Sequence, residues 1–317
     1  MNKNELIAAL ELEDFSSIYK ISDTIRREQK GDIVDIRAIL EFSNYCKQDC
    51  AYCGLNCKNK TVSRYRMSKE EIIKTAKETA LAGYKTIVLQ SGDDDFFSVS
   101  LLGEIVKAIA KTGITITLSC GNKSYESLKY LHECGASRYL LKHETSNPEL
   151  YEKFHHTSTF SQRITCLKDI KKAGFEVGSG FMVGLPGQTL FDIANDIHLL
   201  KTLECDMAGI GPFISHGATP LKGCANGSTE LTKRAIALAR IEIPSINLPA
   251  TTALGVINKG EKNDVFSCGA NVVMLKVTPT EFKKKYEIYP AQFSKTDIKK
   301  QRQELEDEIK SLNRIPY

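Results

Sequence analysis

Residues 33–53, IVDIRAILEFSNYCKQDCAYC, largely decide which fold this sequence predicts. The first ten of them, IVDIRAILEF, are dominated by β-branched and other apolar residues, which predicts a strand over 33–42. Three cysteines follow closely, Cys46, Cys50 and Cys53, in the spacing C-x3-C-x2-C. The loop at the carboxyl end of a parallel strand is where α/β proteins place functional groups, so this order predicts a site directly after the first strand.

Downstream of this stretch, strand-like runs alternate with amphipathic segments of helical length. Ser68 and Glu71 form a capping box that predicts a helix over 68–83. Repeated strand–helix units predict a parallel sheet. Further helices are expected over roughly 98–112, 125–135 and 161–174, and strands over 33–42, 86–92, 114–121, 138–144, 175–184, 207–213, 247–253 and 270–275.

The number of these units predicts the fold class. Eight strand–helix units over about 250 residues are typical of a closed (β/α)8 TIM-type barrel of the α/β class. A doubly wound open sheet is the alternative. Without a linker or an internal repeat, a single domain over 1–317 is expected. Its core would span about 33–280, with an N-terminal helix before it and a C-terminal helical extension over 281–317.

Composition excludes several classes of protein. The 317 residues are 42% hydrophobic and carry a net charge of only +4, which argues against a nucleic-acid partner. The sequence contains no uninterrupted run of 18 apolar residues, so no membrane span is expected. No signal peptide is recognisable either, so a cytoplasmic protein is expected. In a reducing compartment the ten cysteines favour metal binding or burial over disulfides. Six dispersed ones are expected to be buried: Cys120, Cys134, Cys166, Cys205, Cys224 and Cys268.

The cysteine spacing favours an iron–sulfur cluster over zinc. Structural zinc sites add a second ligand pair, which this sequence lacks after Cys53. Ferredoxins use four thiolates for each [4Fe–4S] cluster, whereas three would leave one iron open to a chelating ligand. Cys57 could supply a fourth thiolate and so a closed electron-carrying cluster, although Lys58 stands where the ferredoxin pattern has proline.

Charged residues follow the fourth expected strand. Alternation along RYLLKHE places Lys142 and Glu144 on one face, with His143 on the other. If that face points into the barrel, Glu144 could meet a cationic amino group or a ribose, and Lys142 an anion. The alternative is an ion pair between the two at the rim. Arg163, in the first turn of the helix expected over 161–174, is placed either for a carboxylate ligand or on the surface.

Hydroxyl and amide groups occur on other expected strands. Thr251 and Thr252 end the seventh strand, Thr117 lies on the third and Gln90 on the second. Buried groups of this kind need hydrogen-bond partners, which in a barrel could be a substrate or water. The alternative is that the threonines are ordinary strand-forming residues.

The motif CKQDCAYC, with Tyr52 just before the third cysteine, resembles the radical S-adenosylmethionine (SAM) superfamily. That resemblance implies one [4Fe–4S] cluster held by Cys46, Cys50 and Cys53, with SAM chelating the open iron. It implies reductive cleavage of SAM to a 5′-deoxyadenosyl radical, and it places Tyr52 on the adenine side of the site. A loop aromatic that simply packs is the alternative for Tyr52.

Longer stretches resemble the HydE family of [FeFe]-hydrogenase maturases, within that superfamily. They are CAYCGL, RYRMSKEEI, TIVLQSGDD, RYLLKHETSNPEL, MVGLPGQT, GIGPFISHGATPL, PATTALG and GANVVM. The resemblance implies that SAM contacts Ser91, Gly92, Asp93, Glu144 and Arg163. It also implies a substrate cavity lined by Gln90, Thr117, Lys142, Thr251, Thr252, Met274, Tyr286 and Tyr289.

The same resemblance implies a reaction and partners. The substrate would be a small cysteine-derived organometallic complex on the route to the diiron subcluster. HydG and HydF would be possible partner maturases, and a ferredoxin or flavodoxin would be the reductant. Two positions depart from the family pattern: Lys142 stands where arginine is usual, and Leu275-Lys276 where Pro-Asn is usual. The alternatives are an amino-acid mutase similar to methylornithine synthase, and an iron–sulfur electron carrier without radical chemistry.

Overall fold

The computed structural model describes residues 1–257, 261–290 and 297–317, and its centre is a ring of parallel strands. The strands are hydrogen-bonded in the order β7-β5-β4-β3-β2-β1-β10-β9. A parallel bridge between Met207 and Asn247 brings the two ends of this order together. The predicted TIM-type α/β barrel is therefore confirmed. Its eight strands are β1 (Ile33–Ser43), β2 (Thr86–Ser91), β3 (Thr115–Ser119), β4 (Arg138–Leu140), β5 (Glu176–Ser179), β7 (Met207–Ala208), β9 (Pro249–Ala250) and β10 (Val272–Lys276).

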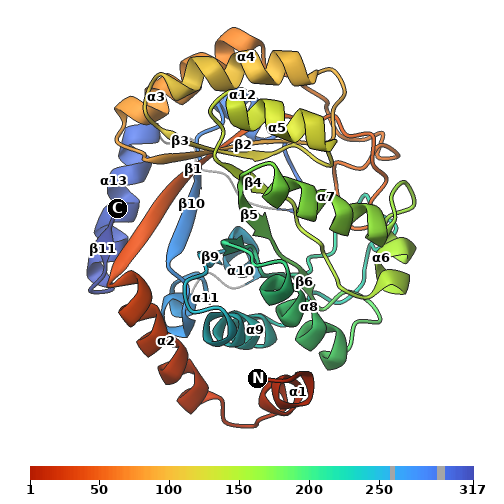
Figure 1. The fold of residues 1–317 in the computed structure, drawn as a ribbon, viewed down its shortest axis with the longest axis vertical. Coiled ribbons are helices and arrows are strands. Elements are labelled where there is room, and N and C mark those ends of the chain that lie inside the picture. The colour runs from red at the N-terminus through yellow and green to blue at the C-terminus, as the bar shows by residue number, and fades with distance from the viewer. Residues whose placement is uncertain (258–260, 291–296) are drawn as a thin grey trace.

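Helices surround these strands on the outside (Figure 1). The predicted N-terminal helical segment is present as α1 and α2, and the C-terminal extension carries α13, after which β11 (Ile315–Pro316) pairs with the start of β1. The helices are α1 (Lys3–Leu10), α2 (Ser16–Lys30), α3 (Lys69–Leu81), α4 (Val99–Ala110), α5 (Tyr125–Glu133), α6 (Pro148–Phe154), α7 (Phe160–Lys172), α8 (Leu190–Thr202), α9 (Thr229–Glu242), α10 (Thr252–Ile257), α11 (Glu261–Asp264), η1 (Val265–Cys268), α12 (Thr280–Lys283) and α13 (Ile298–Ser311). None of the described helices is long and apolar enough to cross a bilayer.

The two faces of the strands have different surroundings. On β1, Ile36, Ala38 and Leu40 are fully buried in the apolar layer between strands and helices. Side chains of the alternate residues point into the barrel. Arg37, for example, donates to the sulfur of Met207 on β7, a strand that is not its neighbour (3.5 Å). The interior is therefore lined by the second face of each strand, and we call this interior the lumen.

Charged side chains fill the amino-terminal end of the lumen. Arg37 is only 2% exposed, and its Nε donates to Asp35 (2.7 Å). Arg138 Nε donates to Glu176 (2.6 Å), and its Nη1 to the hydroxyl of Thr86 (3.3 Å). These four charged residues, with the hydroxyl of Thr86, form an ionic layer at this end of the barrel.

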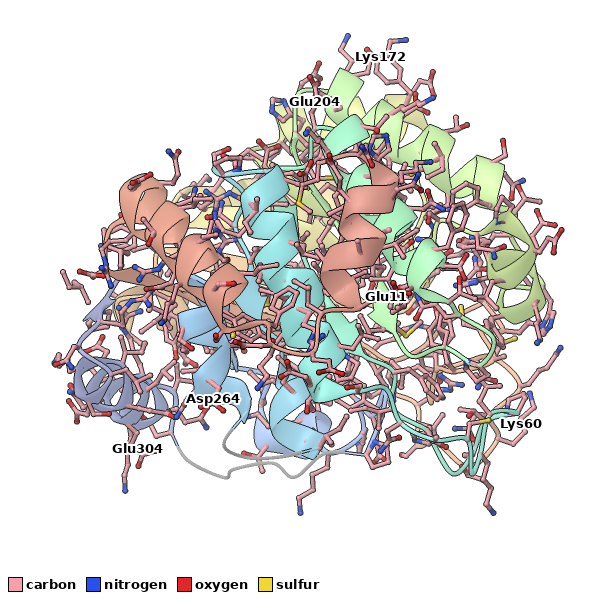
Figure 2. All side chains as sticks on the ribbon, turned by 90° about the horizontal axis from the view of Figure 1, so that it is seen from below. Glu11, Lys60, Lys172, Glu204, Asp264 and Glu304 are labelled. Carbon is pink, nitrogen blue, oxygen red and sulfur yellow. The ribbon has the colours of Figure 1, made fainter. Side chains whose placement is uncertain are left out.

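The carboxyl-terminal end of the barrel, which we call the mouth, carries the cysteine loop. Figure 2 shows Lys60, just after this loop, at one end of the molecule. Lys172 and Glu204, which lie at or just after the ends of α7 and α8, are at the opposite end. The predicted site thus lies at the end of the barrel where this fold carries function.

Three expected strands are shorter or interrupted. The strand expected over 138–144 ends at Leu140, and Glu144, with a positive φ of 66°, interrupts any continuation of the alternation. The strand expected over 175–184 is split at Gly180 (φ 147°), where a Cβ would lie 2.2 Å from the carbonyl oxygen of Gly209. The strand expected over 207–213 is interrupted opposite this point. The continuations, β6 (Met182–Val183) and β8 (Gly211–Pro212), pair with each other.

Two predicted boundaries near the mouth were also wrong. Only Pro249–Ala250 of the strand expected over 247–253 is extended, and Thr252 already begins α10. The helix expected over 161–174 begins at Phe160, because Thr159 and Gln162 form its capping box.

Candidate active site

The loop that carries the cysteines is held against the end of β2. Gly92 N–H donates to the carbonyl of Ser43 (3.0 Å), and Lys47 N–H donates to the carbonyl of Asp93 (2.9 Å). Asp93 N–H lies 3.4 Å from Cys46 Sγ and donates to it. A Cβ on Gly92 would lie 2.1 Å from the carbonyl oxygen of Tyr45, so glycine is required for this close approach.

A second set of contacts holds the other side of the loop. Ala51 N–H donates to the carbonyl of Phe154 (2.9 Å), at the end of α6. The next residue, Tyr52, forms a hydrogen bond with His155 Nε2 (2.7 Å). His155 Nδ1 lies 2.9 Å from the carbonyl of Tyr151, which can only accept, so Nδ1 carries the proton and Tyr52 is the donor. Burial lowers the pKa of His155 to about 3, so this ring stays neutral at physiological pH.

The three cysteines lie close enough to affect one another. Burial raises the pKa of Cys46, raises that of Cys50 well above its usual range, and raises that of Cys53 to about 12. Negative charge on Cys46 and Cys53 raises the pKa of Cys50 further. Backbone N–H groups point at two of the sulfurs, those of Cys46 and Cys53. Buried thiols of this kind ionise when a cationic inorganic group binds them.

The donor set fits an iron–sulfur cluster. Within the described ranges, no three His, Cys, Asp or Glu side chains are positioned to hold a single metal ion. Thiols with backbone N–H groups directed at sulfur, as at Cys46 and Cys53, match what iron–sulfur clusters use. The backbone of Cys57 is turned toward Gln48, whose carbonyl accepts its N–H (2.9 Å).

Glu144, Arg163 and Tyr52 meet beside the cysteines. Burial is the main reason that the pKa of Tyr52 is raised well above 10, and the charge of Glu144 raises it further. Glu144 also raises the pKa of Cys50, while Arg163 lowers it. Arg163 Nε donates to the hydroxyl of Tyr151 (3.0 Å), so its guanidinium is turned inward rather than toward solvent. These side chains place one anion and one cation next to the cluster loop.

The residues after β2 brace this loop. Ser91 Oγ donates to the carbonyl of Gly92 (2.7 Å). Asp93 is 6% exposed, and its carboxylate accepts a hydrogen bond from Gln48 Nε2 (2.7 Å). Lys123 Nζ lies 3.6 Å from its second oxygen. Asp93 therefore holds the loop through both its backbone and its side chain.

Deeper in the barrel, polar groups without protein partners line the lumen. The hydroxyl oxygens of Thr117 and Thr251 are buried and have no hydrogen-bond partner among the described residues. Lys142 lies against Gly209, with Nζ 3.7 Å from the position of a Cβ there, and has no ion pair within the described part of the chain. In particular, the alternative ion pair between Lys142 and Glu144 is not formed. Gln90 shares the inward face with Thr117, two residues nearer the mouth in the strand register.

The remaining predicted residues surround the lumen at both levels. Met274 is partly accessible and pairs in register with Arg37, near the ionic layer. Tyr286 is 2% exposed at the mouth, and burial raises its pKa well above the usual range, with smaller contributions from the charges of Glu41 and the cysteines. The Tyr289 hydroxyl is hydrogen-bonded to the side chain of Thr252, and burial raises its pKa to about 12.

Sequence reasoning missed three residues near this site, Glu41, His155 and Asp196. Glu41, 2% exposed on β1, forms an ion pair with Lys276 on β10 (2.6 Å). A carboxylate within the apolar run IVDIRAILEF could have signalled it, because buried charges need partners. His155 directly follows α6 and Asp196 lies within α8, and no local pattern distinguishes either residue.

Comparison with known proteins agrees with this geometry. The model of the radical SAM superfamily matches residues 40–200. The chain belongs to the radical SAM superfamily. The [FeFe]-hydrogenase maturase subunit HydE of Thermotoga maritima is 47% identical over 274 residues, which cover 86% of this chain and 79% of that one. This radical SAM enzyme is therefore a HydE homologue, and the family implies a [4Fe–4S] cluster and SAM.

More distant similarities extend over the same fold. The 3-methylornithine synthase of Methanosarcina acetivorans is 28% identical over 293 residues, 89% of this chain and 81% of that one. The crystal structure of methylornithine synthase (PylB) superposes with a TM-score of 0.88 at 25% identity, covering all of this radical SAM chain and 94% of that one.

Proposed function

We propose that this radical SAM enzyme works as a HydE-type maturase on a small, cysteine-derived organometallic substrate bound through a carboxylate. The observation that carries the proposal is a set of polar groups in the lumen that have no partner among the residues the structure describes: Lys142 Nζ and the hydroxyls of Thr117 and Thr251. A partly buried cation beside hydroxyls that lack acceptors suits a carboxylate. The high identity to the Thermotoga maritima maturase supports the same substrate class.

In this proposal Cys46, Cys50 and Cys53 hold one [4Fe–4S] cluster, and Cys57 is not a ligand. The cluster and SAM together supply a 5′-deoxyadenosyl radical through reductive cleavage of the sulfonium. The residues of the chain bind and orient SAM and the substrate. Glu144 would bind the ribose or the amino group of SAM, and Arg163 its carboxylate. Tyr52 lies on the adenine side, with its ring fixed by His155, while Ser91, Gly92 and Asp93 shape the edge near the amino group.

The substrate would lie deeper in the lumen. Lys142 and Thr251 would hold its carboxylate, with Gln90, Thr117 and Met274 along the walls, and Tyr286, Tyr289 and Thr252 toward the mouth. Lysine keeps the positive charge of the usual arginine but offers one point of contact instead of a planar pair. The pocket should therefore accept carboxylates with looser geometry.

Partners follow from the same proposal. The cluster requires an electron, which we assign to a ferredoxin- or flavodoxin-type reductant. The substrate would be delivered by a HydG-type maturase, and a HydF-type maturase is a possible recipient of the product.

Two alternatives are less well supported. A lysine mutase similar to methylornithine synthase would need a carboxylate for the substrate amine, and the buried Glu41 is already paired with Lys276. An electron carrier would need no polar pocket beneath the cluster. A change in the cluster spectrum on addition of SAM would argue against the carrier.

The test is a crystal of the reconstituted protein with SAM and free cysteine. The expected result is the cysteine carboxylate within hydrogen-bonding distance of Lys142 and Thr251. In solution, Lys142→Arg should bind cysteine about as well as wild type. Lys142→Met should bind it roughly ten- to a hundredfold more weakly, because a charge-assisted hydrogen bond is lost. A carboxylate bound elsewhere, or equal affinity in the methionine variant, would overturn the substrate assignment.

A further inference from the structure

The backbone at Glu144 is strained. Its φ of 66° lies in the left-handed region, which non-glycine residues rarely occupy. Thr145 N–H donates to the carbonyl of His143 (2.8 Å) across it, which makes a three-residue turn centred on Glu144. Turns of this hand cost free energy and persist only where the surroundings enforce them.

The buried carboxylate of Asp196 lies against the chain on both sides of this turn. Asp196 Oδ1, on α8, accepts the N–H of Ser146. The same oxygen lies 3.4 Å from Nε2 of the His143 ring. The other side of the ring is fixed by Ser179 Oγ, 2.9 Å from Nδ1. Glu144 therefore lies between Ser146, which donates to Asp196, and His143, whose ring lies beside the same carboxylate without a hydrogen bond to it.

The contacts that Asp196 makes beside the turn are buried. His143, Ser179 and Asp196 are all 0% exposed. Complete burial of all three favours a structural role over direct contact with a ligand. The backbone of Glu144 is also hydrogen-bonded to Gly180 and Met182 (3.0 Å each), so the turn projects its side chain toward Cys50 and Tyr52.

We infer that Asp196 is a positioning residue for SAM binding, which acts by holding Glu144 in its strained conformation. This inference rests on the proposed role of Glu144 as a SAM contact. Without the Asp196 carboxylate, the turn relaxes to an ordinary conformation, and the Glu144 side chain leaves the SAM site. SAM must then restore the strained conformation on binding, at a cost of roughly five- to a hundredfold in affinity.

The first test is a double-mutant cycle on SAM affinity, measured from the change in the spectrum of the reconstituted cluster when SAM is titrated. Glu144→Ala and Asp196→Ala should each weaken binding about tenfold or more, and the double variant should bind no more weakly than Glu144→Ala alone. Ser68→Ala is the control, because it removes the cap of α3, which makes no hydrogen bond to the turn within the described residues. It should lower the melting temperature and leave SAM affinity unchanged.

The outcomes separate the two claims. Unchanged affinity in Glu144→Ala would refute the proposed SAM contact itself. Weak binding in Glu144→Ala with normal binding in Asp196→Ala, or full additivity in the double variant, would refute the positioning role alone.

The second test needs no SAM. Amide hydrogen exchange of the segment 143–147 in the ligand-free protein should accelerate at least severalfold in Asp196→Ala. Asp196→Asn keeps an acceptor for Ser146 N–H and should restore part of the protection. Equal exchange in wild type and Asp196→Ala would show that the turn does not depend on this carboxylate.

Discussion

Gly92→Ala should prevent cluster assembly while leaving the barrel folded. A Cβ there would lie 2.1 Å from the carbonyl oxygen of Tyr45 and 2.8 Å from Cys46 Cβ. Real contacts of a Cβ are not shorter than 3.0 Å, so the backbone just before the first cysteine must move by about 1 Å. Overpacking of this kind costs roughly 1–3 kcal/mol, less than the stability of a large barrel. The displaced Cys46 would no longer be placed to bind the same cluster as Cys50 and Cys53.

The assay is iron bound per chain after anaerobic reconstitution, with far-ultraviolet circular dichroism of the apoprotein beside it. Wild type should bind about four irons, and Gly92→Ala fewer than about one, with an unchanged dichroism spectrum. Gly217→Ala is the matched control, because no atom lies within 4 Å of a Cβ at that glycine. A Gly92→Ala protein with a full cluster and a normal response to SAM would refute this account of the loop.

Three further predictions concern the same region. Cys50→Ala should lose the cluster and Cys57→Ala should keep it, as iron analysis would show; the reverse result would overturn the ligand assignment. Arg163→Ala should assemble its cluster but bind SAM roughly ten- to a hundredfold more weakly in a spectral titration, and unchanged affinity would leave the residue without a ligand role. His155 has its pKa depressed to about 3, whereas the unfolded chain binds this proton near 6.5, so its contribution to stability is present above about pH 6.5 and is lost as pH falls toward 3. Melting of the apoprotein should therefore depend less on pH in this window for His155→Gln than for wild type, and parallel curves would contradict this.

The sequence predicted what depends on local pattern. The apolar run before Cys46 is β1, and the capping box at Ser68 and Glu71 begins α3 as expected. Repetition of such units was sufficient for the barrel, because each strand and its helix are recognisable by themselves. The inward direction of Lys142 stays a prediction, because the regular alternation on which it rested ends at Leu140.

Features that depend on distant partners were not predictable. The turn at Glu144 is enforced by Asp196, about fifty residues later, and nothing in RYLLKHE signals it. Gly180 breaks its strand because it lies against Gly209 of the strand beside it. The pairing of Glu41 with Lys276 joins the first and last barrel strands, whose adjacency exists only once the ring has closed.

The ionic layer around Arg37 and Arg138 affects how ligands enter and leave the barrel. Because this layer lies across that end of the barrel, we expect exchange with solvent to run through the mouth, where the cysteine loop lies. A molecule that binds deep in the lumen must arrive before one that binds at the mouth, and must leave after it. The order of binding would then be set by the shape of the barrel rather than by the relative affinities of the two ligands. Steady-state kinetics should show a compulsory sequence, in which the deeper ligand is trapped while the outer one is present.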